Sequence, residues 1–226
     1  MVELEQIDFA YREGRFRLSI PALHVADGER VAVVGPSGTG KTTLLNLVAG
    51  IIRPAAGTLR VAGTDLGTMS DDALRRFRAS TVGFVFQDFA LLDYLTAREN
   101  ILYPYRITPA LRLGADVRER AEALATEVGL DQKLDRHPPA LSQGEQQRIA
   151  ICRALVTQPR LVLSDEATGN LDPENKDLIL DLLFRQAAQA GASVLAVTHD
   201  HALLPRFDRV VDFAQFQSAR PQAAPA

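Results

Sequence analysis

The sequence contains a single cysteine among its 226 residues, so an intramolecular disulfide is excluded. A chain without disulfides is typical of a reducing compartment. Cys152 lies among apolar residues that are spaced as on a helix. We therefore expect it to be a small buried core residue and not a reactive thiol.

Long apolar runs and a strong charge of either sign are also missing. No uninterrupted apolar run approaches the roughly 18 residues that a membrane helix needs. Residues 1–16 lack the basic and apolar regions of a secretory signal. The net charge of -3 gives no general attraction to nucleic acid or to anionic lipid. We expect a cytoplasmic protein that binds no nucleic acid and reaches a membrane only peripherally, through a partner.

The residues that are present are typical of a globular protein. Hydrophobic residues make up 46% of the chain and charged residues 23%, and the length suits one α/β domain with or without an insertion. Strand-like apolar patterns occupy residues 2–11, 16–29, 30–35, 57–63, 81–87, 160–166 and 193–200. Helical spacing occupies residues 41–51, 70–80, 117–130 and 173–191.

The order of these patterns predicts an α/β fold. Strands come first and then alternate with helices, which indicates a mainly parallel sheet core with an N-terminal antiparallel β subdomain. Residues 91–140 show mostly helical signals, so we expect a helical insertion subdomain there. Residues 1–90 and 141–213 would form the core, and residues 214–226, rich in Ala, Gln and Pro, a flexible tail.

A phosphate-binding loop stands between the third predicted strand and the first helix. GPSGTGKT, residues 35–42, fits G-x-x-x-x-G-K-[ST] in the strand–helix context that this motif requires. A plain glycine-rich turn is the alternative, but a turn does not need the pair Lys41 and Thr42. The fold is thus predicted to be a RecA-like P-loop NTPase. The candidate nucleotide-binding residues are Gly35, Pro36, Ser37, Gly38, Thr39, Gly40, Lys41, Thr42 and Thr43.

Two acids and a histidine end later apolar strands. Asp165 supplies a carboxylate that suits Mg²⁺ beside the Thr42 hydroxyl. Because successive side chains of a strand point to opposite faces, we expect Glu166 to face a water in line with the γ-phosphate, as a general base. The alternative is that both acids only cap the next turn. A lone histidine is usually structural, but His199 ends a core strand, which favours a γ-phosphate contact.

The segment LSQGEQQRIA, residues 141–150, raises a separate question. Ser142 is followed three places later by Glu145 and then by a helical pattern, which is a capping box. The capping box explains neither Gly144 nor the polar first turn. The capping box alone leaves open what the start of this helix faces.

Together these motifs resemble those of the nucleotide-binding subunits of ABC transporters, over about residues 11–199. Residues 35–42 resemble the Walker A motif, residues 161–166 the Walker B motif and residues 141–148 the signature LSGGQ. Further positions resemble the A-loop aromatic residue that stacks on adenine (Tyr11), the Q-loop (Gln87), the D-loop (Leu171 and Asp172) and the switch histidine (His199).

The resemblance implies a specific chemistry. Mg-ATP would be bound with Thr42, Gln87 and Asp165 as metal ligands, and hydrolysis would depend on Glu166, His199 and Gln87. A second copy of the chain would pair head to tail with the first, so that each signature meets the nucleotide on the other copy.

The implied partner-facing residues are Ser142, Gly144 and Glu145, at a helix N-terminus that prefers anions. Transmembrane permease subunits would be the other partners, docking on Gln87 and residues 88–100. The alternative is that Phe89, Leu91, Leu92 and Tyr94 belong to the core of the insertion.

Three positions depart from the family pattern. Gln143 stands where the family usually has Gly, Glu145 where it has Gln, and Ala167 where it has Pro. A carboxylate near a triphosphate repels it, so we expect Glu145 to stay turned back towards the Ser142 backbone N–H. Ala167 is expected to loosen the loop that leads to Asp172.

The segments at residues 168–172 and 86–101 most resemble a subgroup that contains LolD, MacB and FtsE. Its ATPases act with permeases in lipoprotein extraction, efflux or cell-wall hydrolase control. The predicted function is to drive lipoprotein release or export. The alternatives are an FtsE-like cell-division ATPase, a soluble non-transport ABC ATPase, and a module that binds nucleotide without hydrolysing it.

Overall fold

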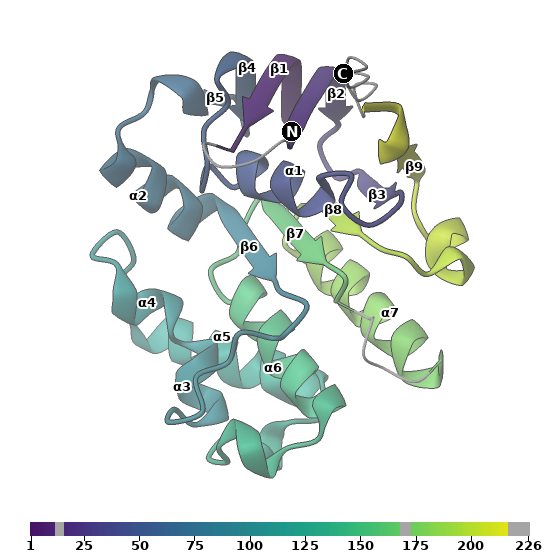
Figure 1. Ribbon diagram of the computed structural model, residues 1–226. Coiled ribbons are helices and arrows are strands. Elements are labelled where there is room, and N and C mark those ends of the chain that lie inside the picture. The colour runs from purple at the N-terminus through teal and green to yellow at the C-terminus, as the bar shows by residue number, and fades with distance from the viewer. Residues whose placement is uncertain (12–15, 168–172, 217–226) are drawn as a thin grey trace, which may run out of the picture.

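The computed structural model describes residues 1–11, 16–167 and 173–216, without the side chains of residues 173–175. A four-stranded antiparallel sheet, in the order β2-β1-β4-β5, lies at one end of the molecule, and a five-stranded parallel sheet, in the order β6-β7-β8-β3-β9, runs through its middle (Figure 1). The antiparallel strands are β1 (Val2–Ala10), β2 (Arg17–Val25), β4 (Ala56–Val61) and β5 (Thr64–Asp65). The parallel strands are β3 (Arg30–Val34), β6 (Val82–Val85), β7 (Leu161–Asp165), β8 (Ser193–Val197) and β9 (Arg209–Asp212).

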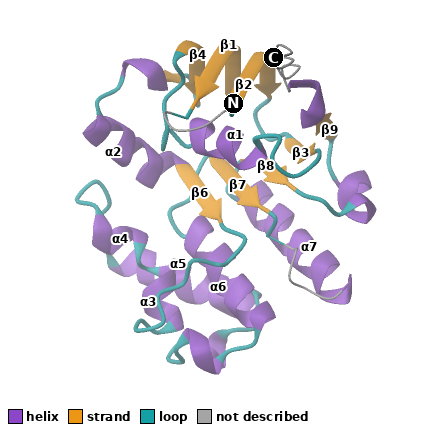
Figure 2. Ribbon diagram, viewed as in Figure 1, coloured by secondary structure: helices purple, strands orange, loops and turns teal. Residues whose placement is uncertain are grey.

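Helices cover both faces of the parallel sheet, and α3, α4 and α5 gather in a lobe beyond β6, with α6 beside them (Figure 2). The α-helices are α1 (Lys41–Val48), α2 (Asp71–Thr81), α3 (Ala97–Ile101), α4 (Pro104–Ile107), α5 (Ala115–Glu127), α6 (Gln143–Leu155) and α7 (Pro173–Gln189). Short 3-10 helices are η1 (Leu66–Thr68), η2 (Asp131–Lys133), η3 (Pro138–Ala140), η4 (His201–Arg206) and η5 (Phe213–Phe216). This is the predicted P-loop α/β fold with a parallel core and an antiparallel β subdomain; strand β9 was not predicted.

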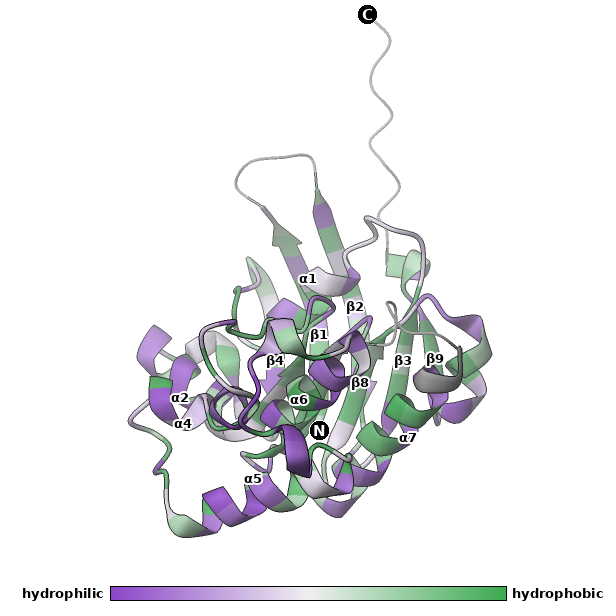
Figure 3. Cartoon of the chain, turned by 90° about the horizontal axis from the view of Figure 1, so that it is seen from below, coloured by the Kyte–Doolittle hydropathy of each residue, from purple (hydrophilic) through white to green (hydrophobic). Residues whose placement is uncertain are grey.

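Strands β7 and β8 separate two apolar clusters. Val162 and Val194 join the cluster formed with the helical lobe, α6 and α7, whereas Leu161 and Leu195 join the cluster formed with α1 and the antiparallel sheet. Neighbouring residues of a strand face opposite sides, so a strand covered on both sides is apolar throughout. Figure 3 shows the difference between hydrophobic strands of the parallel sheet and helix α5, which carries both hydrophilic and hydrophobic residues. Cys152 is buried in the first cluster, as predicted, and burial raises its pKa to about 12.

The helical lobe shares its core with the helices that follow it. Ile101 and Leu130 of the lobe, Ile149 of α6 and Ile179 of α7 belong to one buried cluster. We propose a helical subdomain at residues 91–140, as the sequence predicts, with α6 as its structural link to the sheet.

The chain after β9 differs in part from the expected tail. Residues 213–216 form η5, and the side chains of Phe213 and Phe216 are buried against the antiparallel side of the core. Their rings pack edge to face with centroids 5.2 Å apart. Residues 214–216 therefore pack on the core, and residues 217–226 lie outside the described residues.

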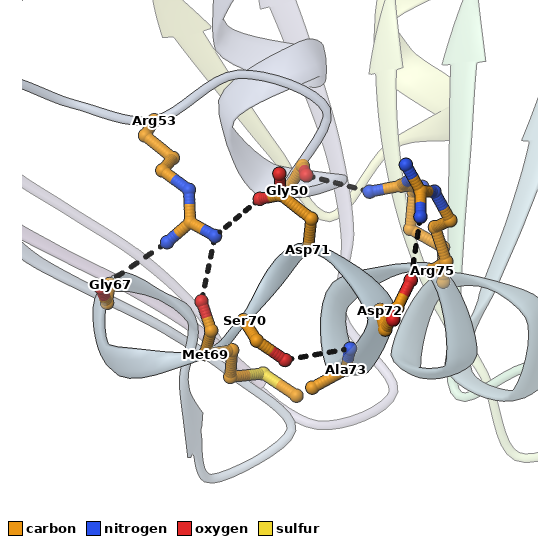
Figure 4. Close-up of polar contacts among 10 residues, drawn as sticks. Gly50, Arg53, Gly67, Met69, Ser70, Asp71, Asp72, Ala73 and Arg75 are labelled. Carbon is orange, nitrogen blue, oxygen red and sulfur yellow. Dashed lines mark hydrogen bonds and ion pairs between the residues drawn. The ribbon is translucent and has the colours of Figure 1, made fainter.

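Helix α2 anchors the far end of α1, the helix that follows the phosphate loop. Ser70 caps α2 by accepting a hydrogen bond from the backbone N–H of Ala73 at 3.3 Å, and Arg53 donates to carbonyl oxygens of the loop before it (Figure 4). Arg78 of α2 donates to the carbonyl oxygen of Gly50, just beyond α1, at 2.6 Å. A cation at a helix C-terminus offsets the negative end of the dipole. This contact fixes α1 from the end opposite to the loop.

Gly83 allows β6 to lie directly against α6. A Cβ atom at this position would be 2.2 Å from the carbonyl oxygen of Ala154 and 3.0 Å from Pro159. Real Cβ atoms do not approach backbone oxygen so closely, so glycine is required at this crossing. The signature helix is thereby held close to the strand that leads to Gln87.

Gly83→Ala should lower the free energy of unfolding by about 3 kcal/mol, because the added methyl must push β6 away from α6. Urea denaturation measures this change. Gly144→Ala is the matched control, because its Cβ would have only the Arg148 guanidinium within reach, at 3.8 Å. Equal stability of the two variants would contradict the proposed close packing.

Candidate functional site

The phosphate loop connects β3 to α1 through left-handed backbone. Gly38 and Gly40 have φ angles of 79° and 101°. A Cβ atom at Gly40 would also lie 2.6 Å from a ring carbon of Phe16, which comes from the start of the antiparallel sheet. Only glycine fits this conformation beside an aromatic ring. The loop can therefore curl its backbone N–H groups inward, as phosphate cradles do.

The N-terminus of α1 differs from those of the other long helices whose starts are described. Helices α2 and α6 have side-chain caps and acids in the first turn, and α5 has an acid there. Helix α1 has neither, and its first residue is Lys41. A cation at the positive end of a helix with uncapped N–H groups is unfavourable unless an anion binds there. This helix start is therefore built for an anion.

Lys41 is held over the loop by backbone oxygens. Its Nζ donates to the carbonyl oxygens of Gly35 at 2.8 Å and of Pro36 at 3.0 Å, and its side chain is buried. Burial lowers the pKa of Lys41, while the carboxylates of Glu166 and Asp165 oppose that shift. The ammonium is thus placed between the loop and the acids, where a phosphate chain would lie.

An open cavity of about 390 Å³ lies at this edge of the sheet, a size that suits a small-molecule ligand. It brings the phosphate loop together with residues that follow β7 and β8, as the sequence predicts. Among the described residues that line it, none comes from the signature segment, residues 141–148. The lining residues are Phe16, Ser37, Gly38, Gly40, Lys41, Thr42, Thr43, Glu166 and His199.

The side chains of Asp165 and Thr42 form a hydrogen bond beside the cavity. Burial raises the pKa of the Asp165 carboxyl, and a hydrogen bond from the Thr42 hydroxyl holds it down. Hydroxyl and carboxylate oxygens are the donors that Mg²⁺ takes from proteins when phosphates and water supply the rest. Within the described chain, no group of three or more His, Cys, Asp or Glu side chains gathers to hold a metal alone. The pair fits a Mg²⁺ ion that arrives with a phosphate-bearing ligand.

Glu166 and His199 form a hydrogen-bonded pair in the cavity. His199 Nε2 lies 2.9 Å from Glu166 Oε1, and the backbone N–H of Glu166 donates to the carbonyl oxygen of Val197 at 3.0 Å. We expected strand alternation to point the side chains of Asp165 and Glu166 in different directions, and this explanation is wrong. Strand β7 ends at Asp165, and Glu166 has a left-handed φ of 48°, so the backbone turn and not strand alternation aims its side chain. Such strain in a residue other than glycine is typical of functional sites.

Aromatic side chains border the cavity beside the loop. The Tyr11 hydroxyl lies 3.3 Å from Thr43 Oγ1, and its ring packs against Phe9 and, at 5.8 Å, against Phe16. The sequence motifs identified Tyr11 but not Phe16, which is the aromatic residue that lines the cavity itself. Thr39, another candidate, is buried and donates to the carbonyl oxygen of Pro36 at 2.9 Å, so its side chain shapes the loop.

Gln87 follows β6 on the exposed surface, and the loop after it is tied to the signature helix. Phe89 and Ala90 both have left-handed φ angles, 63° and 46°. Arg153 of α6, nearly buried, donates to their carbonyl oxygens at 2.6 Å and 2.5 Å. Burial lowers the pKa of Arg153, and the charge of Asp88 opposes this. Sequence reasoning missed Arg153, whose signal was an arginine within the apolar run of α6.

The predicted docking segment is divided between core and surface. Phe89 is buried and Leu91 packs against the lobe core, whereas 73% of the Tyr94 surface is exposed. Asn100 is fully buried and holds the segment by accepting from the backbone N–H of Leu92 at 2.8 Å. The core alternative therefore holds for Phe89 and Leu91, whereas docking of a permease on the exposed residues stays a prediction.

The capping box of the signature segment is present as predicted. Ser142 N donates to Glu145 Oε2 at 2.9 Å, and Glu145 N donates to Ser142 Oγ at 3.3 Å. An unpredicted third group, the Lys133 ammonium, binds Glu145 Oε1. The ammonium and the Ser142 contacts hold the pKa of the Glu145 carboxyl below its usual value.

The fold of a single chain does not require glycine at position 144. It has no left-handed φ, and an added Cβ would find only the Arg148 guanidinium, at 3.8 Å. Ala167 is buried in the lobe-side cluster. The D-loop candidates Leu171 and Asp172, and with them the predicted loosening of that loop, lie outside the described residues.

None of the helices in the described ranges has the length and apolar character that a bilayer crossing requires.

The chain is similar to known proteins over most of its length. The profile of a family described as "ABC transporter" matches residues 18–169. A curated protein named lipoprotein-releasing system ATP-binding protein LolD, from Anaeromyxobacter dehalogenans, is 47% identical over 197 residues, covering 85% of this chain and 82% of its own. The LolD protein of Chromohalobacter salexigens is 46% identical over 218 residues, covering 95% and 91%. The dimeric post-hydrolysis structure of the ATP-binding cassette MJ0796, bound to ADP and Pi, has a TM-score of 0.83 and 32% identity, and the match covers 94% of each chain.

Arg153→Lys should lower the free energy of unfolding by about 2 kcal/mol, because one ammonium cannot reproduce the forked contact to two carbonyl oxygens. Urea denaturation measures the loss. Arg160→Lys, on the exposed surface, is the matched control and should stay within about 0.5 kcal/mol of the parent. If the two variants were equally stable, Arg153 would not be holding the loop after Gln87.

Proposed function

This chain belongs to the ABC transporter family of ATP-binding proteins, and we propose that it hydrolyses ATP as a homodimer to drive a transmembrane permease in lipoprotein release. One observation carries the proposal. The phosphate loop, Glu166 and His199 line one cavity, and Asp165 is hydrogen-bonded to Thr42 of that loop, whereas no residue of the signature segment, which begins α6, lines the cavity. A site divided in this way is completed by a second copy.

The nucleotide half of the site would act as follows. The uncapped N-terminus of α1 and Lys41 bind the β- and γ-phosphates. Tyr11 and Phe16 offer aromatic faces to the base. Thr42 and Asp165, with Gln87 from the neighbouring strand end, would hold Mg²⁺, which supplies charge neutralisation of the phosphates when bound.

Glu166 is proposed as the general base of hydrolysis. Its carboxylate accepts a proton from the attacking water, and His199, 2.9 Å away, orients that carboxylate and reaches towards the γ-phosphate. The left-handed backbone at Glu166 fixes this aim before substrate arrives. Two polar groups positioned in advance lower the cost of organising the transition state.

The signature half would bind the nucleotide of the other copy. Ser142 and the N–H of Gly144 stand at the first turn of α6, and the absence of a side chain at Gly144 lets a phosphate approach. Two triphosphates then join two chains, and hydrolysis removes the charge that holds them together. The dimer is thus a two-state element biased by its ligand. The dimeric state of the cassette MJ0796 supports this arrangement.

The transport role rests on the relatives. Curated LolD proteins up to 47% identical to this chain are named for lipoprotein release. The permease would dock on Gln87 and the exposed part of residues 88–100, including Tyr94, which keeps the ATPase peripheral on the cytoplasmic face of the membrane. Arg153 would pass movement of that segment to α6.

Co-purification from detergent-solubilised membranes tests the transport role. A tagged chain with Glu166→Gln and ATP should bring down a transmembrane permease, identified by mass spectrometry. Recovery of ribosomal particles or nucleic acid would instead support a soluble non-transport ATPase. A cell-division permease without effect on lipoprotein release would favour the FtsE-like alternative.

Glu166→Gln should bind ATP and dimerise, yet its turnover should fall between about 100-fold and about 10,000-fold, because the amide cannot accept the proton of the water. A phosphate-release assay measures turnover. Glu119→Gln, an exposed acid on α5, is the matched control and should keep full activity. Near-normal turnover of Glu166→Gln would show that another group is the base.

Gly144→Ala should leave stability and monomer ATP binding unchanged and weaken ATP-driven dimerisation by about ten-fold or more, because the methyl lies where the second chain's phosphate approaches. Analytical ultracentrifugation in the Glu166→Gln background measures dimerisation. Unchanged dimerisation would mean that α6 does not meet the partner's nucleotide.

A further inference from the structure

A carboxylate lies at the anion-facing end of α6. Glu145 is the only acid in the first turn of this helix, and only 13% of its side chain is exposed. Left unpaired, it would repel a triphosphate that approaches the same helix turn. The proposed function therefore requires that something in the chain compensates this charge.

Both oxygens of the Glu145 carboxylate are engaged. Oε2 accepts the Ser142 backbone N–H at 2.9 Å, and Oε1 accepts the Lys133 ammonium. The first contact turns the carboxylate back onto its own helix, as the capping box requires. The second contact brings a full positive charge to the same helix start.

Backbone hydrogen bonds hold Lys133 in position. It ends η2, its N–H donates to the carbonyl oxygen of Leu130 at 2.9 Å, and its own carbonyl oxygen accepts from Arg136 at 3.0 Å. The flanking Leu130 and Leu134 are buried in the core of the helical lobe. The ammonium, 45% exposed, therefore reaches Glu145 from a rigid support and still faces solvent.

We propose that Lys133 is a positioning residue that holds back and neutralises Glu145, so that the start of α6 receives the triphosphate bound to a second copy of the chain. This inference rests on the proposed function. It explains how a chain with a carboxylate at this position keeps an anion-binding helix start. It assigns to η2, a segment outside every motif of the sequence, a role in assembly.

If charge at Glu145 decides the matter, the variants should differ in a fixed order in ATP-driven dimerisation, measured in the Glu166→Gln background. Lys133→Gln leaves one uncompensated negative charge and should weaken dimerisation by about ten-fold. Glu145→Gln should equal or exceed the parent, because it removes that charge. The double variant Lys133→Gln/Glu145→Gln has the same net charge as the parent and should return to within about three-fold of it.

Three further measurements separate positioning from a purely structural role. Lys133→Arg should keep parent dimerisation. The defect of Lys133→Gln should diminish as salt is raised, because screening weakens the repulsion. ATP binding to the monomer, measured by titration calorimetry, should be the same for all variants, because neither residue lines the nucleotide cavity.

Two results would overturn the inference. If Lys133→Gln dimerises like the parent, the pair is a surface contact without a role in assembly. If Glu145→Gln fails to rescue Lys133→Gln, charge at Glu145 is not the reason for the defect. Failure of the Glu166→Gln parent itself to dimerise with saturating ATP is a different outcome, which overturns the proposed function and this inference with it.

Discussion

The site depends on positive charge at the start of α1 that no cap or acid of the helix's own first turn offsets. Lys41 stands at the positive end of a helix whose first turn has no side-chain cap and no acid, although other long helices of the described chain have one or both. That arrangement costs stability in the isolated chain and is relieved by a phosphate. The loop glycines, the ring of Phe16 beside Gly40 and the Arg78 contact at the other end of α1 all serve to hold this helix start in place.

The second constraint is the order of the strands. Because β7 lies between β6 and β8, and β3 lies beyond β8, residues far apart in sequence meet at one edge of the sheet. Asp165, Glu166 and His199 arrive there from adjacent strands, and Gln87 follows the strand on the other side of β7. The signature helix is held against this edge by Gly83 and Arg153 but keeps its N-terminus outside the cavity. We propose that one chain therefore carries two half-sites of different character.

Much of this could be predicted from periodicity and motifs. The alternation of strands and helices along the chain, the capping box at Ser142 and the meeting of the strand ends depend on patterns that the sequence displays, such as the apolar run that ends at Asp165. The missed features depend on tertiary contacts between distant residues. Phe16 lies over Gly40, Arg153 binds two carbonyl oxygens of the Gln87 loop, and Lys133 reaches Glu145. The left-handed turn at Glu166 was missed because neither a glycine nor an asparagine announces it.

The central claim is that each nucleotide-binding site is completed by residues of a second chain. The most direct test mixes two inactive variants, Lys41→Ala, which lacks the phosphate contact, and Gly144→Asp, which places a carboxylate on the signature. If the sites are shared between copies, the mixed dimer contains one intact site, and ATP turnover of an equimolar mixture should rise well above that of either variant alone. If turnover of the mixture equals the mean of the two separate variants, each chain holds its complete site and the account is wrong.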